Sequence, residues 1–272
     1  MELFDTHFHY DGEDTPAGFM ANVRMELAVP PQLDAGVVDS LELLAMGGDL
    51  TESCRARSFA EAVPNARWAA GVHPHNAERY LAAREDLSPL FSGDSRPAAV
   101  GELGLDYYYG LSPKQAQTAV LEEFLALALD KSLPAVIHIR DGEGRDEAYR
   151  DAYERLVPFA RSGGRFVVHC FAGTPAWAEK FLELGGYCGF TGMITFRRAE
   201  NVREALRAVP DDRLLIETDS PYLAPVPHRG KKNHPGYLVL IAQTAASLRG
   251  MSTEELAALT TLNARNLFPE RA

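Results

Sequence analysis

Eight short apolar runs, separated by segments with helical patterning, constrain the fold of this chain more than any other feature. The runs cover residues 3–9, 41–46, 67–72, 98–105, 135–139, 166–170, 187–190 and 214–218. Most of them are continuously apolar rather than alternating, which is typical of strands covered on both faces. Repeated strand–helix units predict a parallel sheet, and eight of them in about 250 residues predict a closed (β/α)₈ TIM barrel.

Helix signals lie between the apolar runs. Ser and Pro open the segment 112–130, and Thr and Pro open the segment 174–184, as expected for an N-cap followed by Pro at the first helical position. Residues 252–255 read Ser-Thr-Glu-Glu and predict a capping box at the start of the last helix. Within residues 11–65, where the pattern is weakest, a helix is expected around residues 15–27.

Length and composition fit one large domain. The chain has 272 residues, 46% of them hydrophobic, and shows no repeat or linker, so residues 1–272 are expected to form a single barrel. No uncharged apolar run approaches the roughly 18 residues of a membrane span, and no signal peptide is visible. The odd number of cysteines, 3, argues for a reducing compartment, and we expect a cytoplasmic location.

Five of the eight histidines lie at the ends of predicted strands, where barrel active sites are built. These are His7, His9, His73, His138 and His169. Residues two apart on a strand share a face, so the first two side chains would enter the barrel mouth together and suit a divalent transition metal. The alternatives are partly exposed histidines on an edge strand and, for the single histidines, hydrogen-bonded positions in the core.

Carboxylates occur at comparable positions. Glu102 lies inside an apolar, glycine-flanked run, where a charge is costly unless it is paired or bound to metal. It could bridge two metals or form a buried salt bridge with an arginine. Asp219 could ligate a metal and accept a proton from a bound water, or cap a turn. We expect Asp106 to cap a loop and Glu217 to support the ligands from behind.

Taken together, these side chains predict a site for two divalent cations, with Mg²⁺, Mn²⁺ and Zn²⁺ as candidates. The proposed ligands are His7, His9, Glu102, His138, His169 and Asp219. Four neutral imidazoles and two carboxylates carry −2, and two divalent cations bring about +4. The site would therefore be locally positive inside a chain of net charge −11, and it would attract an anionic substrate.

Several motifs, in collinear order from residue 3 to about 268, resemble those of the TatD family of metal-dependent hydrolases. They are Asp5-x-His7-x-His9, Gly71-Val-His73-Pro74-His75, Gly101-Glu102-x-Gly104-Leu105-Asp106-Tyr107, His138-x-Arg140-Asp141, His169-Cys170-Phe171-x-Gly173, Glu217-Thr218-Asp219-x-Pro221-Tyr222 and Pro225-Val226-Pro227-His228-Arg229-Gly230-Lys231-Lys232-Asn233.

The resemblance implies a barrel of the amidohydrolase type that hydrolyses phosphodiesters, typically as a 3′-to-5′ exonuclease on DNA. By the same resemblance, His7 and His9 hold one metal, and His138 and His169 hold the other. Glu102 bridges the two. Asp219 is a ligand of the first metal. Phe8, Tyr10 and His234 depart from the family pattern, and these departures concern the pocket rim or scaffold and hence substrate choice.

In the mechanism that we expect, Asp219 orients the attacking water and accepts its proton. Glu102 holds both metals. The leaving 3′-oxygen takes a proton from water or from His73, which could instead make a loop-capping hydrogen bond. We expect His75 to cap the helix that follows it, outside the site.

Substrate contacts are expected at the rim of the barrel. Arg140, Tyr222 and Arg229 would contact phosphate or sugar, and Tyr107 would stack on a base. The alternatives are a plain salt bridge for Arg140, packing at the rim for the tyrosines, and a solvated loop for the basic segment 229–232.

Two other functions fit the same sequence. One is an amidohydrolase acting on an amide, ester or lactone, with a deacylase of aminoacyl-RNA as a variant. The other is a non-catalytic metal-binding scaffold, against which the complete ligand set argues. No dinucleotide-binding glycine motif, Walker loop or Gly-x-Ser-x-Gly elbow is present, so no nucleotide cofactor is expected. The expected partner is a DNA strand, with no membrane involved.

Overall fold

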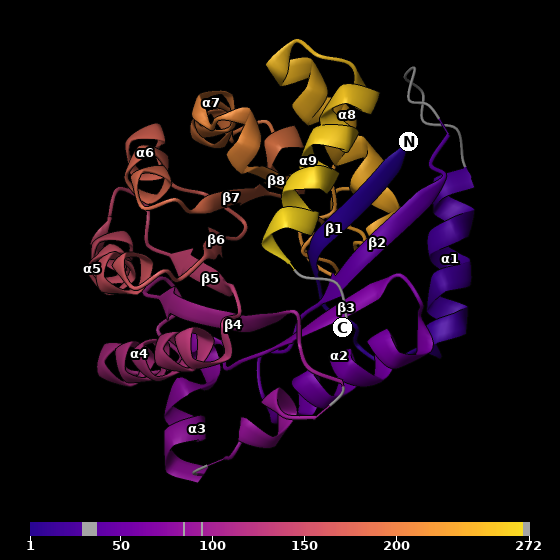
Figure 1. Cartoon of the computed structure of the whole chain (residues 1–272). Coiled ribbons are helices and arrows are strands. Elements are labelled where there is room, and N and C mark those ends of the chain that lie inside the picture. The colour runs from indigo at the N-terminus through magenta and orange to yellow at the C-terminus, as the bar shows by residue number, and fades with distance from the viewer. Residues whose placement is uncertain (29–36, 84, 94, 269–272) are drawn as a thin grey trace.

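Eight parallel strands form one sheet that curves into a barrel, and helices surround it (Figure 1). This computed structural model describes residues 1–272 except 29–36, 84, 94 and 269–272. The strands are β1 (Glu2–Phe8), β2 (Ser40–Ala45), β3 (Ala66–Ala70), β4 (Ala99–Asp106), β5 (Ala135–Arg140), β6 (Phe166–Val168), β7 (Tyr187–Phe190) and β8 (Leu214–Ile216). They pair in sequence order from β1 to β8. The predicted (β/α)₈ barrel is confirmed.

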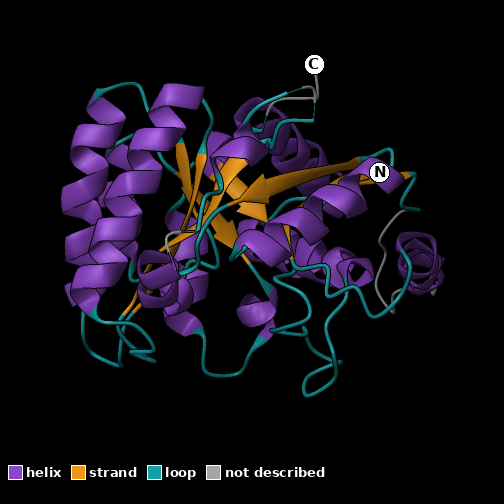
Figure 2. Cartoon of the chain, turned by 90° about the horizontal axis from the view of Figure 1, so that it is seen from below, coloured by secondary structure: helices purple, strands orange, loops and turns teal. Residues whose placement is uncertain are grey.

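The helices lie outside the strands, as the view from below shows (Figure 2). They are α1 (Pro16–Ala28), α2 (Leu50–Ala62), α3 (Ala77–Ala83), α4 (Lys114–Lys131), α5 (Glu147–Arg161), α6 (Pro175–Glu183), α7 (Glu200–Ala208), α8 (Leu238–Arg249) and α9 (Thr253–Leu267). None of these helices in the described ranges is long and apolar enough to cross a bilayer.

The predicted helix starts are largely as expected. Thr174 caps α6 by accepting a hydrogen bond from a backbone N–H, and Ser252 forms the predicted capping box with Glu255. At α4 the predicted cap, Ser112, lies one residue before the observed N-cap. Its hydroxyl donates to the carbonyl of His75 at 2.9 Å, so it is used by the loop before α3 instead.

The bottom of the barrel is closed by α9. Asn263 donates to the carbonyl of Leu214 at 2.9 Å, and the ring of Phe268 lies 6.2 Å from that of Phe4. Both phenylalanines are fully buried. Apolar side chains therefore fill the lower half of the barrel, and the polar site is confined to its upper end.

Contacts between β1 and the segment after β8 close the barrel. Asp219 donates its backbone N–H to the carbonyl of His7 at 2.8 Å, and His9 donates to that of Ser220 at 2.7 Å. The Asp5 carboxylate accepts from the Thr218 backbone at 2.9 Å and from its hydroxyl at 2.6 Å. The first and last elements of the barrel thus present their polar side chains next to each other.

The expectation of one barrel domain covers residues 1–272 and so includes 29–36, 84, 94 and 269–272, which lie outside the described residues. All eight strands belong to a single sheet. The exact extent of the domain stays a prediction.

Replacing Gly104 by alanine is expected to prevent the pairing of β4 with β5. This glycine pairs with His138 at a φ of +147°, and a Cβ here would lie 1.9 Å from the His138 carbonyl oxygen. We expect Gly104→Ala to lower the free energy of unfolding, measured with urea, by about 3 kcal/mol or more. The control is Gly163→Ala, at a φ of +86° with nothing within 4 Å, which should cost about 1 kcal/mol. Equal losses for the two variants would contradict this assignment.

Candidate metal centre

The carboxyl ends of the strands open into a cleft of about 1620 Å³. Its lining includes most of the side chains that the sequence singled out as ligands: His9, Glu102, His138, His169 and Asp219. His7 lies beneath them and is completely buried. The structure therefore brings all six predicted ligands together, from both sides of the β8–β1 closure and from the middle strands.

Glu102 lies between two groups of imidazoles, and each of its oxygens faces one group. Oε2 lies 3.4 Å from Nε2 of His7 and 3.5 Å from Nε2 of His9. Oε1 lies 2.9 Å from Nδ1 of His138 and 2.8 Å from Nε2 of His169. With 2% of its surface exposed, this carboxylate lies between the two groups, where it would bridge two cations held by them.

The first group is completed by Asp219. Its Oδ1 lies 3.7 Å from Nε2 of both His7 and His9, and these two nitrogens lie 3.3 Å apart. Nitrogen and oxygen ligands about 2.0–2.1 Å from a tetrahedral ion lie about 3.3 Å from one another. The two imidazole nitrogens therefore lie close to this spacing from each other and from each carboxylate oxygen that faces them.

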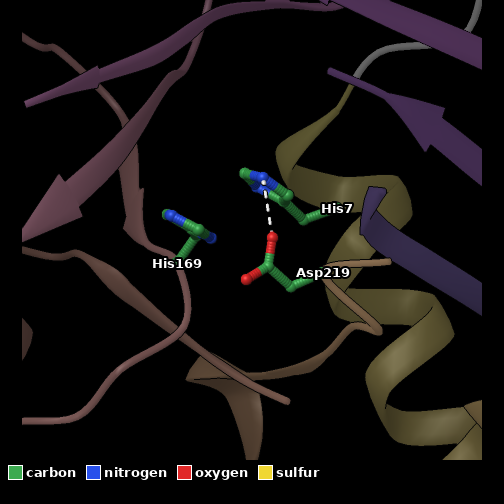
Figure 3. A group of neighbouring side chains, drawn as sticks. All are labelled: His7, His169 and Asp219. Atoms are coloured by element: carbon green, nitrogen blue, oxygen red, sulfur yellow. Dashed lines mark ion pairs between the residues drawn. The ribbon is translucent and has the colours of Figure 1, made fainter. Parts of the chain in front are cut away.

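Asp219, His7 and His169 point toward one another from three separate parts of the barrel (Figure 3). Their ligand atoms all lie within 4.8 Å of one another. The rings of His7 and His169 are stacked, with centroids 3.8 Å apart. The two groups of ligands are therefore in direct contact.

His73 belongs with the second group. The facing nitrogens of His138 and His169 lie 3.3 Å apart. Nε2 of His73 lies 3.5 Å from Oε1 of Glu102, and the structure places His73, Glu102 and His138 within ligand distance of one another. Its Nδ1 accepts the backbone N–H of His75, so the other nitrogen faces the cluster. His73 is thus a further candidate ligand, and its role as proton donor stays a prediction.

Asp106 is a residue of the site that sequence reasoning placed only in the loop. Its Oδ1 accepts the backbone N–H groups of Tyr108 and Tyr109, which is the predicted capping. Its Oδ2 also lies 2.8 Å from Nε2 of His75 and 3.3 Å from Nε2 of His138. This carboxylate therefore orients His138 from behind. Its spacing of four residues from Glu102 on one strand was the available signal.

The expectation for His75 was wrong in detail. The side chain that caps the short helix after β3 belongs to His73, which accepts from the backbone of His75. The His75 ring instead contacts Asp106. The reason is that these residues lie in a loop beyond β3, where strand alternation no longer determines which way a side chain points.

Glu217 supports the centre from below, as expected. Its Oε1 lies 3.5 Å from Nδ1 of His169 and accepts the backbone N–H of Cys170 at 2.5 Å. A Cβ on Gly189 would lie 2.5 Å from Oε2 of Glu217, so only glycine leaves room for this carboxylate. Cys170 lines the cleft, because β6 ends at Val168 and the φ of Cys170 is +45°.

Burial opposes charge throughout the cluster, and neighbouring groups decide which members stay charged. Burial lowers the pKa of His7 to about 4 and raises the pKa of Asp219 to about 6. Burial by itself would raise the pKa of Glu102. The imidazoles around it, His169 foremost, outweigh burial and hold the pKa of this carboxyl well below its usual range. Against the effect of burial, Glu102 holds the pKa of His169 well above its usual range.

The residues fit a pair of divalent cations. The buried carboxylate of Glu102 requires compensating positive charge, and nitrogen and oxygen atoms converge on each of its oxygens. Mixed imidazole and carboxylate ligands suit Zn²⁺ or Mn²⁺.

Three of the four predicted substrate contacts line the cleft: Arg140, Tyr222 and Arg229. Tyr107 does not. Its hydroxyl donates to Asp151 at 2.8 Å, and the Lys114 ammonium lies 4.2 Å from its ring centroid, so it packs between helices and the strand end. Tyr109 lines the cleft instead, because the chain turns after β4 ends.

The chain resembles known proteins over nearly its whole length. The sequence model of the family described as TatD related DNase matches residues 4–269. An uncharacterized metal-dependent hydrolase, YcfH, of Escherichia coli (strain K12) is 38% identical over 268 residues, covering 98% of this chain and 96% of that protein. A protein named 3′-5′ ssDNA/RNA exonuclease TatD, from Citrobacter rodentium (strain ICC168), is 36% identical over 231 residues. The match covers 83% of this chain and 86% of that protein.

A solved structure agrees with these relatives. The crystal structure of YJJV, described as a TatD homolog from Escherichia coli K12, superposes with a TM-score of 0.83 at 26% sequence identity. The match covers 98% of each chain. The likeness therefore extends over the whole barrel rather than over a shared motif.

Neutralising Glu102 is expected to remove metal from both groups of ligands. Glu102→Gln deletes the negative charge that both groups share, so the metal retained after dialysis should fall from about two ions per chain to below one. Elemental analysis by mass spectrometry measures the content. The control is Glu143→Gln, an exposed carboxylate of the same cleft, which should retain the wild-type content. Wild-type metal content in a folded Glu102→Gln protein would rule out the bridging role.

Proposed function

Because the chain belongs to the TatD related DNase family of metal-dependent hydrolases, we propose that it hydrolyses phosphodiester bonds and removes nucleotides from the 3′ end of a single DNA strand. The name of the Citrobacter relative, a 3′-5′ ssDNA/RNA exonuclease, supports this substrate and polarity. The observation that carries the proposal is the bridging position of Glu102 at the floor of the cleft. Paired divalent cations are a common device for in-line phosphoryl displacement.

The proposed ligands are divided between two positions. His7, His9 and Asp219 would hold one ion, and His138 and His169 would hold the other, with Glu102 between them. Divalent ions bound there would lower the pKa of a water and neutralise charge on the phosphoryl oxygens.

Asp219 is the residue proposed to handle the proton. It lines the cleft, whereas His7 beside it is fully buried, so Asp219 is within reach of a water that enters with the substrate. It takes the proton as the water oxygen bonds to phosphorus and the bond from phosphorus to the 3′-oxygen breaks. The leaving oxygen takes a proton from water or from His73. Glu102 and Glu217 keep the imidazoles in position.

Arginine and tyrosine at the rim are proposed to hold the nucleotide. The guanidinium of Arg140 lies 4.6 Å from the ring centroid of Tyr108 and 4.7 Å from that of Tyr109, which fixes the orientation of this exposed side chain. The ring of Tyr222 lies 6.1 Å from that of His9 and is 62% exposed. Guanidinium groups suit phosphates, and exposed tyrosines suit bases.

The compartment also belongs to the proposal. Cys54, Cys170 and Cys188 are all free thiols. Free thiols are expected of a protein in a reducing environment. We therefore keep the cytoplasm as the proposed location.

A nuclease assay tests the proposal directly. Protein stripped with a chelator is given Mg²⁺, Mn²⁺ or Zn²⁺ in turn, together with a 5′-labelled single-stranded DNA. We expect shortening from the 3′ end that depends on metal, because catalysis depends on ions held by Glu102. The Glu102→Ala variant, purified in the same way, should be inactive, which excludes a contaminating nuclease.

Two results of this assay would count against the proposal. Absence of cleavage with every metal would refute phosphodiester hydrolysis, and the same protein would then be assayed on esters, amides and aminoacyl-RNA. Equal cleavage by the Glu102→Ala protein would assign the activity to a contaminant.

The tyrosines after β4 offer a matched test of base stacking. Tyr109 lines the cleft, whereas Tyr108, equally exposed at 55% against 52%, does not. We expect Tyr109→Ala to raise KM for the DNA strand about tenfold with little change in kcat, since a base stack contributes about 1–3 kcal/mol. Tyr108→Ala should change KM less than threefold. An equal rise in both variants would mean that the effect runs through Arg140, which both rings contact.

A further inference from the structure

A second, smaller hollow of about 510 Å³ adjoins the cleft at the loops that follow β7 and β8. Ala172, Met193, Asn201 and Arg229 line both spaces. A molecule bound at the metal centre could therefore continue into the smaller hollow without leaving the surface of the protein.

The lining of the smaller hollow is basic and includes no carboxylate. Arg197, Arg198 and Arg229 line it, and no aspartate or glutamate does. The cleft itself carries several carboxylates besides the ligands, and the chain has a net charge of −11. Within the described part of the chain, no carboxylate forms an ion pair with these three guanidinium groups. We call this space the arginine hollow.

The arginines of the adjoining helix α7, unlike those of the arginine hollow, form ion pairs. Arg203 lies 2.8 Å and Arg207 lies 3.0 Å from oxygens of Glu200, so both are neutralised by an ion pair. Arg197 and Arg198 lie just before the same helix and are exposed. Their charges are therefore available to a ligand, whereas those of the helix are not.

The backbone that carries these arginines is held in place. Arg203 donates to the carbonyl of Phe196 at 2.6 Å. The loop after β8 is tied to the loop after β7, because Val226 donates its backbone N–H to the hydroxyl of Thr195 at 2.9 Å. The guanidinium of Arg229 lies 3.7 Å from the ring centroid of Phe196. The positive charges are thus presented by a fixed frame, which reduces the entropy lost on binding.

We propose that the arginine hollow binds the backbone phosphates of a single nucleic-acid strand next to the bond that is cleaved. The identity of the ligand rests on the proposed function. Guanidinium groups bind phosphate through paired N–H donors, and three unpaired ones next to a phosphodiester site suit successive phosphates. Since Glu102 is 2% exposed at the floor of the cleft, the ligand is proposed to be a single strand, whose phosphate is not held in a duplex.

The test compares Arg197→Ala/Arg198→Ala with Arg24→Ala/Arg96→Ala. The control pair removes the same charge from exposed positions that line neither the cleft nor the arginine hollow. For each protein, KM and kcat are measured with a DNA 20-mer and a trinucleotide. The Kd of the labelled 20-mer is measured by fluorescence anisotropy on chelator-treated protein at several salt concentrations. Circular dichroism and metal content verify that each variant is folded.

In the Arg197→Ala/Arg198→Ala variant, KM and Kd for the 20-mer should rise about tenfold, and kcat should stay within about twofold of the wild-type value. The slope of log Kd against log salt should fall by about 1.4, because each lost phosphate contact removes about 0.7. The trinucleotide is too short to span both spaces, so its KM should rise much less than that of the 20-mer. The control pair should match the wild type.

Two results would overturn the inference: an unchanged Kd for the 20-mer, or an equal rise in KM for both substrates. If the wild type hydrolyses DNA and either of these results is obtained, only the inference about the arginine hollow is overturned. The proposed nuclease function would then stand. Binding that depends on Arg197 and Arg198, without hydrolysis by the wild type, would support the hollow and refute the proposed nuclease. Failure of the wild type to bind the 20-mer would refute both.

Discussion

The polar end of the barrel depends on one buried carboxylate, Glu102. An isolated charge in such a position costs several kcal/mol, so it persists only where hydrogen-bond donors or positive charge face it. Imidazoles from separate strands face each of its oxygens, at distances of 2.8 to 3.5 Å. The groups that compensate this charge are the same groups that can hold metal. The stability of this region and its chemistry are therefore two consequences of a single interaction.

The barrel makes this arrangement possible because its strands are parallel and end on the same side. The closure between Asp5 and Thr218 brings the first and last strands together, so that His7 and Asp219 meet. Gly104 lets β5 approach β4 closely enough for His138 to reach the centre. Ligands on such a frame are positioned more precisely than ligands on loops.

An acidic chain can bind a polyanion when its positive charges are local. The interaction of exposed charges is screened over about 8 Å at physiological ionic strength, so the net charge of −11 matters less at the cleft than the nearest side chains. The ion pairs of Arg203 and Arg207 with Glu200 neutralise part of the surface. Arg197 and Arg198 have no such pair within the described residues, and they mark the side on which we expect the strand to lie.

Sequence alone determined the barrel and the set of residues that meets in it. Continuous apolar runs specify buried parallel strands, and a polar residue at the end of such a run must face the barrel mouth. Sequence did not determine the choice of Tyr109 over Tyr107, the capping role of His73 in place of His75, or the second role of Asp106. These side chains depend on turns beyond the strand ends, where strand alternation no longer applies. Which arginines stay unpaired was also decided by tertiary structure, because ion pairs join residues whose distance the sequence does not specify.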